Sequence, residues 1–345
     1  MAFDGPIPRG VNAVKRSHDV AQIISRCRGR PGHLGRFCTG LVPGLLRAGQ
    51  RPEAGLRLHH RGTVEAVLQR IAPGLQGTYA QTIKLDSRPG AAGLTAARQV
   101  SSAPGDGSVL LTTPTSSITL VPQIARGDAL RQQDFKPVIT IGSAPICFVV
   151  GPAVPAEVRT LRDYLRWVEL NPDRSGFGSP GVGTGSHLIG AALGRLAQAD
   201  LRHVAYRGAG PAAEDLMSGQ LPAMSMLLGN YLPRAATGKL RVLAITGATR
   251  SRYVPEVPTY AELGFGLLTE LENYAMLMPA SASTAQAEQL ADLLRTHLAR
   301  PETVKALAEI GVDPVLDTPE DLSASLSREF GVWREVVEKV GLKRA

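Results

Sequence analysis

The chain has 345 residues, of which 43% are hydrophobic and 20% are charged. That is enough apolar material for one large or two medium α/β domains, and no apolar run is long enough to cross a bilayer. The net charge of +8 is concentrated in residues 1–60, which hold ten Lys or Arg and three acids, so the remainder carries only +1. Nucleic-acid binding is therefore not expected, because the body of the chain lacks a basic face interleaved with aromatic residues.

The first sixty residues are rich in Arg, Gly, Pro and His and show no sustained helical or strand periodicity, so we expect no packed core there. A signal peptide would contain 7–15 consecutive apolar residues. The nearest candidate, Leu41–Leu46, is short and interrupted, and no signal peptide is visible. The three cysteines (Cys27, Cys38 and Cys147) lack metal-site spacing, so neither a metal nor a cofactor is expected.

From Gly62 onward regular elements follow one another. Val64, Val67, Leu68, Ile71 and Leu75 recur at helical spacing and predict a helix. A short strand at 83–85, a small-residue helix at 91–100 and a strand at 109–111 come next. This alternation of strand and helix predicts a parallel or mixed sheet with helices on its faces.

The middle of the chain repeats the alternation. Thr160 and Asp163 form a capping box that opens a helix, and a Gly-rich stretch, 175–185, leads into another. Strands are expected at 201–206 and 240–246. A long C-terminal helix opens at Thr318–Asp321, with an apolar face that indicates core packing.

Two apolar segments, 138–150 and 273–279, are expected to cross between two lobes. The fold class is therefore α/β with two lobes, and a ligand site is expected in the cleft between them. The expected boundaries are an atypical basic arm at 1–55 (disordered or misread), lobe 1 at 56–148 and 275–345, and lobe 2 at 149–274.

The densest candidate site is Gly178–His187, where Gly-rich chain enters a helix. Unpaired N–H groups at a helix start favour a carboxylate or phosphate. The alternative is a flexible loop in which Thr184 or Ser186 only caps the helix. Gly176-x-Gly178-x-x-Gly181 matches a dinucleotide fingerprint weakly, because no early βαβ unit frames it.

An enzyme is not expected. Ser186 and His187 are adjacent in sequence, and neighbours rarely present a nucleophile and its base to each other. No Gly-x-Ser-x-Gly elbow is present, so we assign no catalytic residue. Two further polar clusters, Thr112–Ser117 and Tyr206–Pro211, directly follow strands and could bind a polar ligand or form turns.

These three clusters, in this order, resemble the substrate-binding proteins of tripartite tricarboxylate transporters, the Bug receptor family. Ser179–Leu188 is similar to the family's Ser-x-Gly-x-Gly-x-x-x-His-Leu segment. The similar blocks are Ser87–Gly93, Ala103–Gly107, Ser179–Leu188, His203–Gly208 and Ala244–Thr259. The similarity runs from about Gly62 to the C-terminus, and the order and spacing of the blocks make it specific.

The resemblance implies a Venus flytrap fold, a periplasmic location and a cleft that holds a small organic carboxylate through backbone amides, hydroxyls and water. It implies delivery to membrane permease subunits, with no cofactor, and we expect a monomer. The cleft candidates it implies are Thr113, Thr115, Ser116, Ser179, Gly183, Thr184, His187 and Tyr206.

Two departures from the family matter. The family's Pro-x-Pro-x-Gly-Gly loop is replaced by Leu56–Thr63, which leads to the hypothesis that residues 1–61 are a frameshifted or misread N-terminus. The first lobe would then lack a central strand, and the chain would be a degraded, non-binding relative. The second departure is Leu221–Leu227, which carries no acid where the family usually has an aspartate, so an amino-acid ligand is not expected.

Overall fold

The computed structural model describes residues 51–58, 62–88, 91–124 and 130–341. All of them belong to one compact unit, residues 46–345. Most of the expected basic arm, residues 1–50, lies outside the described residues. Within the described ranges, no helix is both long and apolar enough to cross a membrane.

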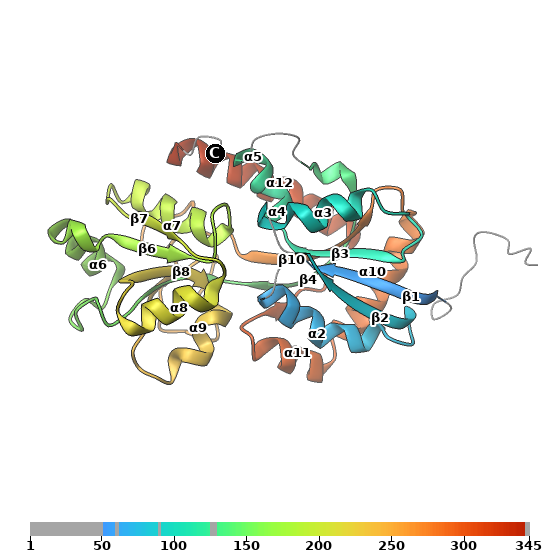
Figure 1. The fold of residues 1–345 in the computed structure, drawn as a ribbon, viewed down its shortest axis with the longest axis horizontal. Coiled ribbons are helices and arrows are strands. Elements are labelled where there is room, and N and C mark those ends of the chain that lie inside the picture. Colours follow the sequence, from blue (N-terminus) through green and yellow to red (C-terminus); the bar gives the residue numbers. More distant parts are fainter. Residues whose placement is uncertain (1–50, 59–61, 89–90, 125–129, 342–345) are drawn as a thin grey trace, which may run out of the picture. The chain divides into compact units, whose positions relative to one another are not determined.

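Two separate sheets form the framework, each flanked by helices (Figure 1). The first sheet has the strand order β11 (Asp313–Pro314), β4 (Phe135–Ala144), β10 (Glu272–Pro279), β3 (Val109–Pro114), β1 (Arg51–Leu58), β2 (Ala80–Ser87). The second has the order β7 (Arg202–Ala205), β6 (Gly176–Ser179), β8 (Ala223–Leu227), β5 (Ile146–Val150), β9 (Arg241–Ile245). Both sheets are mixed, as the alternation of elements predicted, because β10 runs antiparallel to β3 and β5 runs antiparallel to β8.

The described helices are as follows: α2 (Thr63–Leu75), α3 (Leu94–Ser101), α4 (Ser116–Thr119), α5 (Val121–Ile124), α6 (Leu161–Leu170), α7 (Gly185–Leu196), α8 (Ala209–Ser218), α9 (Leu228–Ala235), α10 (Thr284–Leu298), α11 (Pro301–Ala308) and α12 (Pro319–Val340). The capping box predicted for α6 is confirmed. The Thr160 hydroxyl accepts from the Asp163 N–H, and the Asp163 carboxylate accepts from the Thr160 N–H, both at 3.1 Å. Two N–H groups that the helix itself leaves unpaired are satisfied in this way.

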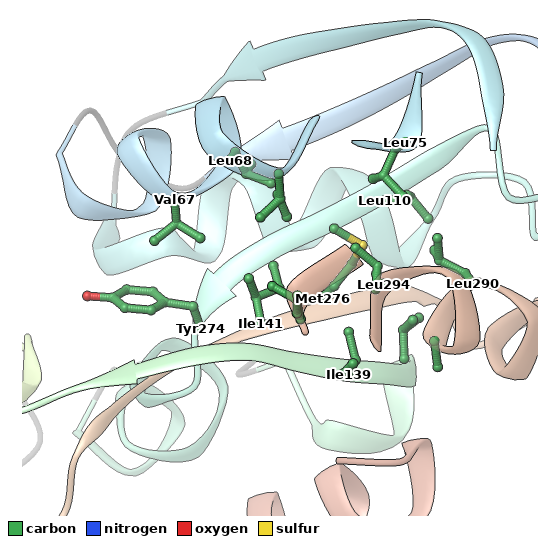
Figure 2. Close-up of a cluster of buried hydrophobic side chains, with 14 of the residues drawn as sticks. Val67, Leu68, Leu75, Leu110, Ile139, Ile141, Tyr274, Met276, Leu290 and Leu294 are labelled. Atoms are coloured by element: carbon green, nitrogen blue, oxygen red, sulfur yellow. The ribbon is translucent and has the colours of Figure 1, made fainter. Parts of the chain in front are cut away.

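The first lobe is built around the first sheet and has its own core (Figure 2). Val67 and Leu68 of α2 and Leu290 and Leu294 of α10 are fully buried against strand residues such as Met276. The apolar positions predicted from helical spacing in α2 are all buried. The periodic stripe therefore packs on the sheet, which is the usual way in which a helix of this length is stabilised.

The second lobe is built around the second sheet, with an aromatic centre. Phe148 of β5 lies 5.3 Å from Tyr164 of α6 and 6.4 Å from Phe177 of β6, measured between ring centroids. All three side chains are fully buried. Tilted aromatic pairs at this separation add to the stabilisation that comes from burial alone.

The strand pairing moves the expected crossings between lobes. β4 belongs to the first sheet and β5 to the second, so the chain crosses at Pro145 and not after residue 148. It returns just before Glu272 and not after residue 274, because β10 begins there and pairs with β4. Periodicity could not place these points, because both sides of each crossing are equally apolar.

The C-terminal helix α12 does not belong to the first lobe alone. Leu322 and Leu326 are buried in a cluster with α3 and β3, whereas Trp333 and Val336 are buried with second-lobe residues. A helix of 22 residues is about 33 Å long, which is enough for its two ends to reach different cores. The assignment of 275–345 to lobe 1 is therefore corrected for the end of α12.

The hypothesis of a misread N-terminus implied that the first lobe lacks a central strand. The structure has a strand at this position. β1 lies between β2 and β3 and runs parallel to both, with Leu56 opposite Leu85 on one side and Leu110 on the other. The expected boundary between arm and lobe at residues 55 and 56 falls inside this strand. Backbone hydrogen bonds of a ladder do not depend on side chains, so a segment without clear periodicity can still be held as a strand. Residues 59–61 lie outside the described residues, and the frameshift itself stays a hypothesis.

Candidate functional site

A cavity of about 110 Å³ is lined by residues of both lobes. By this measure a single water needs roughly 10–15 Å³, so the cavity has room for a small organic molecule. The first lobe contributes Gly62, Thr63, Val64, Ala92, Pro114, Ser116, Ser117, Val121, Glu272 and Tyr274. The second lobe contributes Pro180, Gly183, Thr184, Ser186, Gly208, Ala209, Leu227 and Asn230.

The N-terminal ends of several helices meet at this cavity. The lining includes the starts of α2, α7, α8 and α9, together with the single turn α4. α2 and α8 have glycine N-caps, Gly62 and Gly208, which provide no side-chain cap for the first N–H groups. Both glycines have positive φ, +131° and +107°, which L side chains rarely adopt. The exposed N–H groups and helix dipoles make the cavity favourable for an anion.

The described part of the cavity lining is neutral or acidic in its side chains. Among the described residues that line it, none is Lys, Arg or His, and the polar groups are hydroxyls, one amide and one carboxyl. An anion would therefore be held by hydrogen bonds and helix dipoles and not by an ion pair. This composition agrees with the expectation of a cleft built from backbone amides and hydroxyls.

Three of the eight cleft candidates line the cavity. Ser116 lies in α4, and Gly183 and Thr184 lie at the entry to α7. The Thr184 hydroxyl caps α7 by accepting from the His187 N–H at 3.2 Å, as the capping alternative anticipated. Capping and pocket lining therefore coincide in this residue.

The other five candidates are not in the cavity lining, and four of them make contacts within the protein. Thr113 is fully buried, and the Thr115 hydroxyl donates to the Glu329 carboxylate at 2.9 Å. The Ser179 hydroxyl lies 2.7 Å from Nε2 of His203, and the Tyr206 hydroxyl donates to Asp215 at 2.7 Å. His187 accepts from the Gly183 N–H through Nδ1 at 3.2 Å. The sequence showed that these residues follow strands or lie in loops. It could not show the direction in which each side chain points, because that direction depends on tertiary contacts. Ligand binding by all eight candidates stays a prediction.

The imidazole rings of His187 and His203 lie close together in a tilted arrangement, with 33° between their planes. Their ring centroids are 3.9 Å apart, and both residues line a second cavity of about 640 Å³. Burial lowers the pKa of His187, and burial together with the neighbouring imidazole lowers the pKa of His203 to about 4. Ser186 lines the first cavity and His187 the second, so these neighbours do not form a nucleophile and base at one site.

Glu272 is a cavity residue that the sequence analysis missed. It is the first residue of β10 and only 7% exposed. Burial and the nearby Glu329 raise its pKa to about 8, although hydrogen bonds from Ser116 act in the opposite direction. A Cβ added at Gly185 would lie 2.8 Å from Oε2 of Glu272, so this carboxyl touches the first residue of α7. An acid at the start of a buried strand was the available signal, but the segment was interpreted only as a crossing between lobes.

A second buried acid, Glu329 of α12, lies behind the cavity. One carboxylate oxygen, Oε1, accepts from the hydroxyls of Thr115 and Thr119 at 2.9 Å and from the Trp333 indole at 3.1 Å. Burial raises its pKa to about 7 despite these donors. This network ties α12 to α4, the turn that carries Ser116 into the cavity.

Known proteins share this fold and much of this sequence. A protein described as "UPF0065 protein in tcbD-tcbE intergenic region" from Pseudomonas sp. (strain P51) is 29% identical over 80% of this chain and 82% of its own length. Protein BugT of Bordetella pertussis is 26% identical over 82% of this chain and 86% of its own length. The solved structure of R. palustris Rpa4515 with adipate is 23% identical, covers 85% of this chain and 98% of that chain, and has a TM-score of 0.78.

The family model described as "Tripartite tricarboxylate transporter family receptor" matches residues 67–342. The matched range contains every sequence block on which the resemblance was based. It begins a few residues after Gly62, where the similarity was expected to start. The solved relatives match most of this chain at TM-scores of 0.76 and 0.78, and the two-lobed fold expected from the sequence is confirmed. This chain belongs to the receptor family of the tripartite tricarboxylate transporters.

Proposed function

We propose that the chain is a solute receptor that binds a small organic carboxylate in the cavity between its lobes and catalyses no reaction. The observation that supports this most directly is the cavity wall, where helix starts from both lobes meet and where none of the described lining residues is Lys, Arg or His. A helix N-terminus stabilises a nearby negative charge by about 0.3–1 kcal/mol, and more when partly buried. Four such helix starts at one cavity together favour a bound anion.

The same proposal includes the partner and the place of action. Membership of the receptor family supports delivery of the ligand to membrane permease subunits of a tripartite transporter. The solved relative described as a periplasmic transporter, with a TM-score of 0.76, supports a periplasmic location. The relative solved with adipate supports a carboxylate ligand.

Direct titration tests the proposal. Purified protein would be screened by thermal shift against adipate, succinate, benzoate and the neutral adipamide, and the best ligand would then be measured by calorimetry. We expect stabilisation by a carboxylate that grows with the logarithm of its concentration above the Kd, because the ligand binds only the folded state. We expect none by adipamide, because it carries no charge for the helix starts to stabilise.

A variant that fills the cavity tests whether the ligand binds there. Ala209 is the first residue of α8 and lines the cavity, so Ala209→Phe is expected to abolish the stabilisation. Ala285→Phe is the matched control, since Ala285 is exposed in the first turn of α10. Absence of binding by any carboxylate to the unaltered chain would contradict the proposal and favour the degraded, non-binding relative.

A further inference from the structure

Resting on the proposed function, we propose that Glu272 is the specificity-determining residue of this cavity. In its neutral form it donates a hydrogen bond to the carboxylate of the ligand, so the cavity takes up an anionic ligand together with one proton. Above the pH at which the empty cavity ionises, binding is the reaction of ionised Glu272, ligand carboxylate and one proton to give neutral Glu272 with bound carboxylate.

The geometry places the carboxyl group where it can act on a ligand. Glu272 lines the cavity, and its carboxyl contacts Ser116 of α4 and the backbone of Gly185 at the start of α7. Because the residue is only 7% exposed, the side chain has little freedom to leave the cavity. A carboxylate attracted by the helix starts therefore arrives next to an acid of the protein.

Two carboxyl groups this close cannot both be ionised without a cation between them. The described lining offers no Lys, Arg or His to separate them. The raised pKa of Glu272, about 8, shows that the empty cavity already favours the neutral acid at neutral pH. A neutral carboxylic acid that donates to a carboxylate makes a short, strong hydrogen bond of about 2.5–2.7 Å between oxygens.

A ligand ammonium is the alternative partner for Glu272, and the surroundings disfavour it. Helix N-termini carry partial positive charge and destabilise a cation in the same way that they stabilise an anion. The ionised form that an ammonium requires is also opposed by burial and by Glu329. An amino-acid ligand is therefore still not expected, although the cavity contains an acid.

Among the residues that the structure describes, few other groups near the cavity titrate between pH 6.5 and 9.5. Glu329 faces Glu272 from α12, and its pKa is raised to about 7. Tyr274, two residues along β10, has a pKa raised by burial and by Glu272. From the α7 side, the pKa of His187 is lowered, so it is neutral throughout this range.

Calorimetry with adipate, at pH 6.5, 7.5, 8.5 and 9.5, tests the inference. With a pKa of about 8 in the empty protein, the Kd should weaken about 4-fold by pH 8.5 and about 30-fold by pH 9.5, relative to pH 6.5. Repeating the titration in two buffers of different ionisation enthalpy should show uptake of close to one proton at pH 9.5 and almost none at pH 6.5.

Glu272→Gln keeps the size of the side chain and an N–H donor that does not titrate. We expect its Kd at pH 6.5 to stay within about threefold of the unaltered protein, with no proton uptake and no weakening up to pH 9.5. Glu329→Gln is the control, because Glu329 is a buried acid outside the lining, and it should retain proton uptake. Uptake that Glu329→Gln abolishes and Glu272→Gln preserves would overturn the inference.

The proton measurement on the unaltered protein decides the matter even if a variant fails to fold. A pH-independent Kd for adipate would overturn this inference and leave the proposed function standing. Tighter binding of 6-aminohexanoate than of adipate, strengthening as the pH rises, would also overturn it, since an ammonium would then be the partner. No binding of adipate, succinate or benzoate at pH 6.5 would overturn the proposed function, and this inference with it.

Discussion

Replacing Glu272 by Gln should stabilise the protein, and the gain should grow as the pH rises. In an unfolded chain a glutamate ionises near pH 4.5, whereas buried Glu272 keeps its proton to about pH 8. Between these values the folded state binds one more proton than the unfolded state, so the free energy of unfolding falls as the pH rises. Glutamine has no proton to lose and escapes this penalty.

The size of the effect follows from the pKa difference. One pH unit corresponds to about 1.36 kcal/mol for one proton, so the interval from pH 5.5 to 8.0 gives about 3 kcal/mol. The difference in free energy of unfolding between Glu272→Gln and the unaltered protein should therefore increase by about 2–3 kcal/mol across this interval. Titrating groups that do not interact with Glu272 are common to both proteins and cancel in the difference. Glu329 interacts with Glu272, so its contribution cancels only in part, which is why the expected increase is given as a range.

Urea unfolding at pH 5.5, 6.5, 7.25 and 8.0 measures this difference by linear extrapolation. Glu288→Gln is the matched control, because it makes the same substitution at an exposed position on α10 that does not line the cavity. A difference for Glu272→Gln that stays flat within about 0.5 kcal/mol would refute the reasoning, since Glu272 would then ionise as it does in the unfolded chain.

Two further predictions concern packing and a histidine. Gly229→Ala in α9 would put a Cβ 2.1 Å from the backbone oxygen of Ile310, so we expect a loss of about 1–3 kcal/mol in urea unfolding. Gly210→Ala in α8 has no atom within 4 Å of the new Cβ and should be neutral or stabilising by up to about 1 kcal/mol; equal losses in the two variants would contradict the contact. The pKa of His203 is about 4 in the folded protein and 6.5 in an unfolded chain. Between these values the unfolded state binds more protons, so the free energy of unfolding decreases as the pH falls. The full shift would correspond to about 2 kcal/mol between pH 7 and pH 5, but the ring is only partly buried, so solvent screening lowers this value. His203→Gln should therefore reduce the loss by about 1 kcal/mol, and an unchanged slope would show that His203 is not responsible.

The sequence by itself determined the local elements and the family, and it predicted where in the chain a ligand site should lie. Helical spacing located α2, the capping box located the start of α6, and the order of the similar blocks predicted the two-lobed fold. Ser116, Gly183 and Thr184 were recognised as cleft candidates, and all three line the cavity. These features depend on interactions between residues that are close in sequence. Such interactions require particular residue types at fixed spacings, and these spacings can be recognised in the sequence.

Only the tertiary structure decided which acid faces the ligand cavity and which candidates face elsewhere. Glu272, Ser116 and Gly185 belong to three elements that are far apart in the chain, and they meet only when both lobes have formed. Likewise, β1 is held in place by ladders to β2 and β3, although its own sequence shows no strand period. The charge state of a buried acid and the pairing partners of a strand both depend on contacts between elements that are distant in the chain. A local sequence pattern therefore predicts neither.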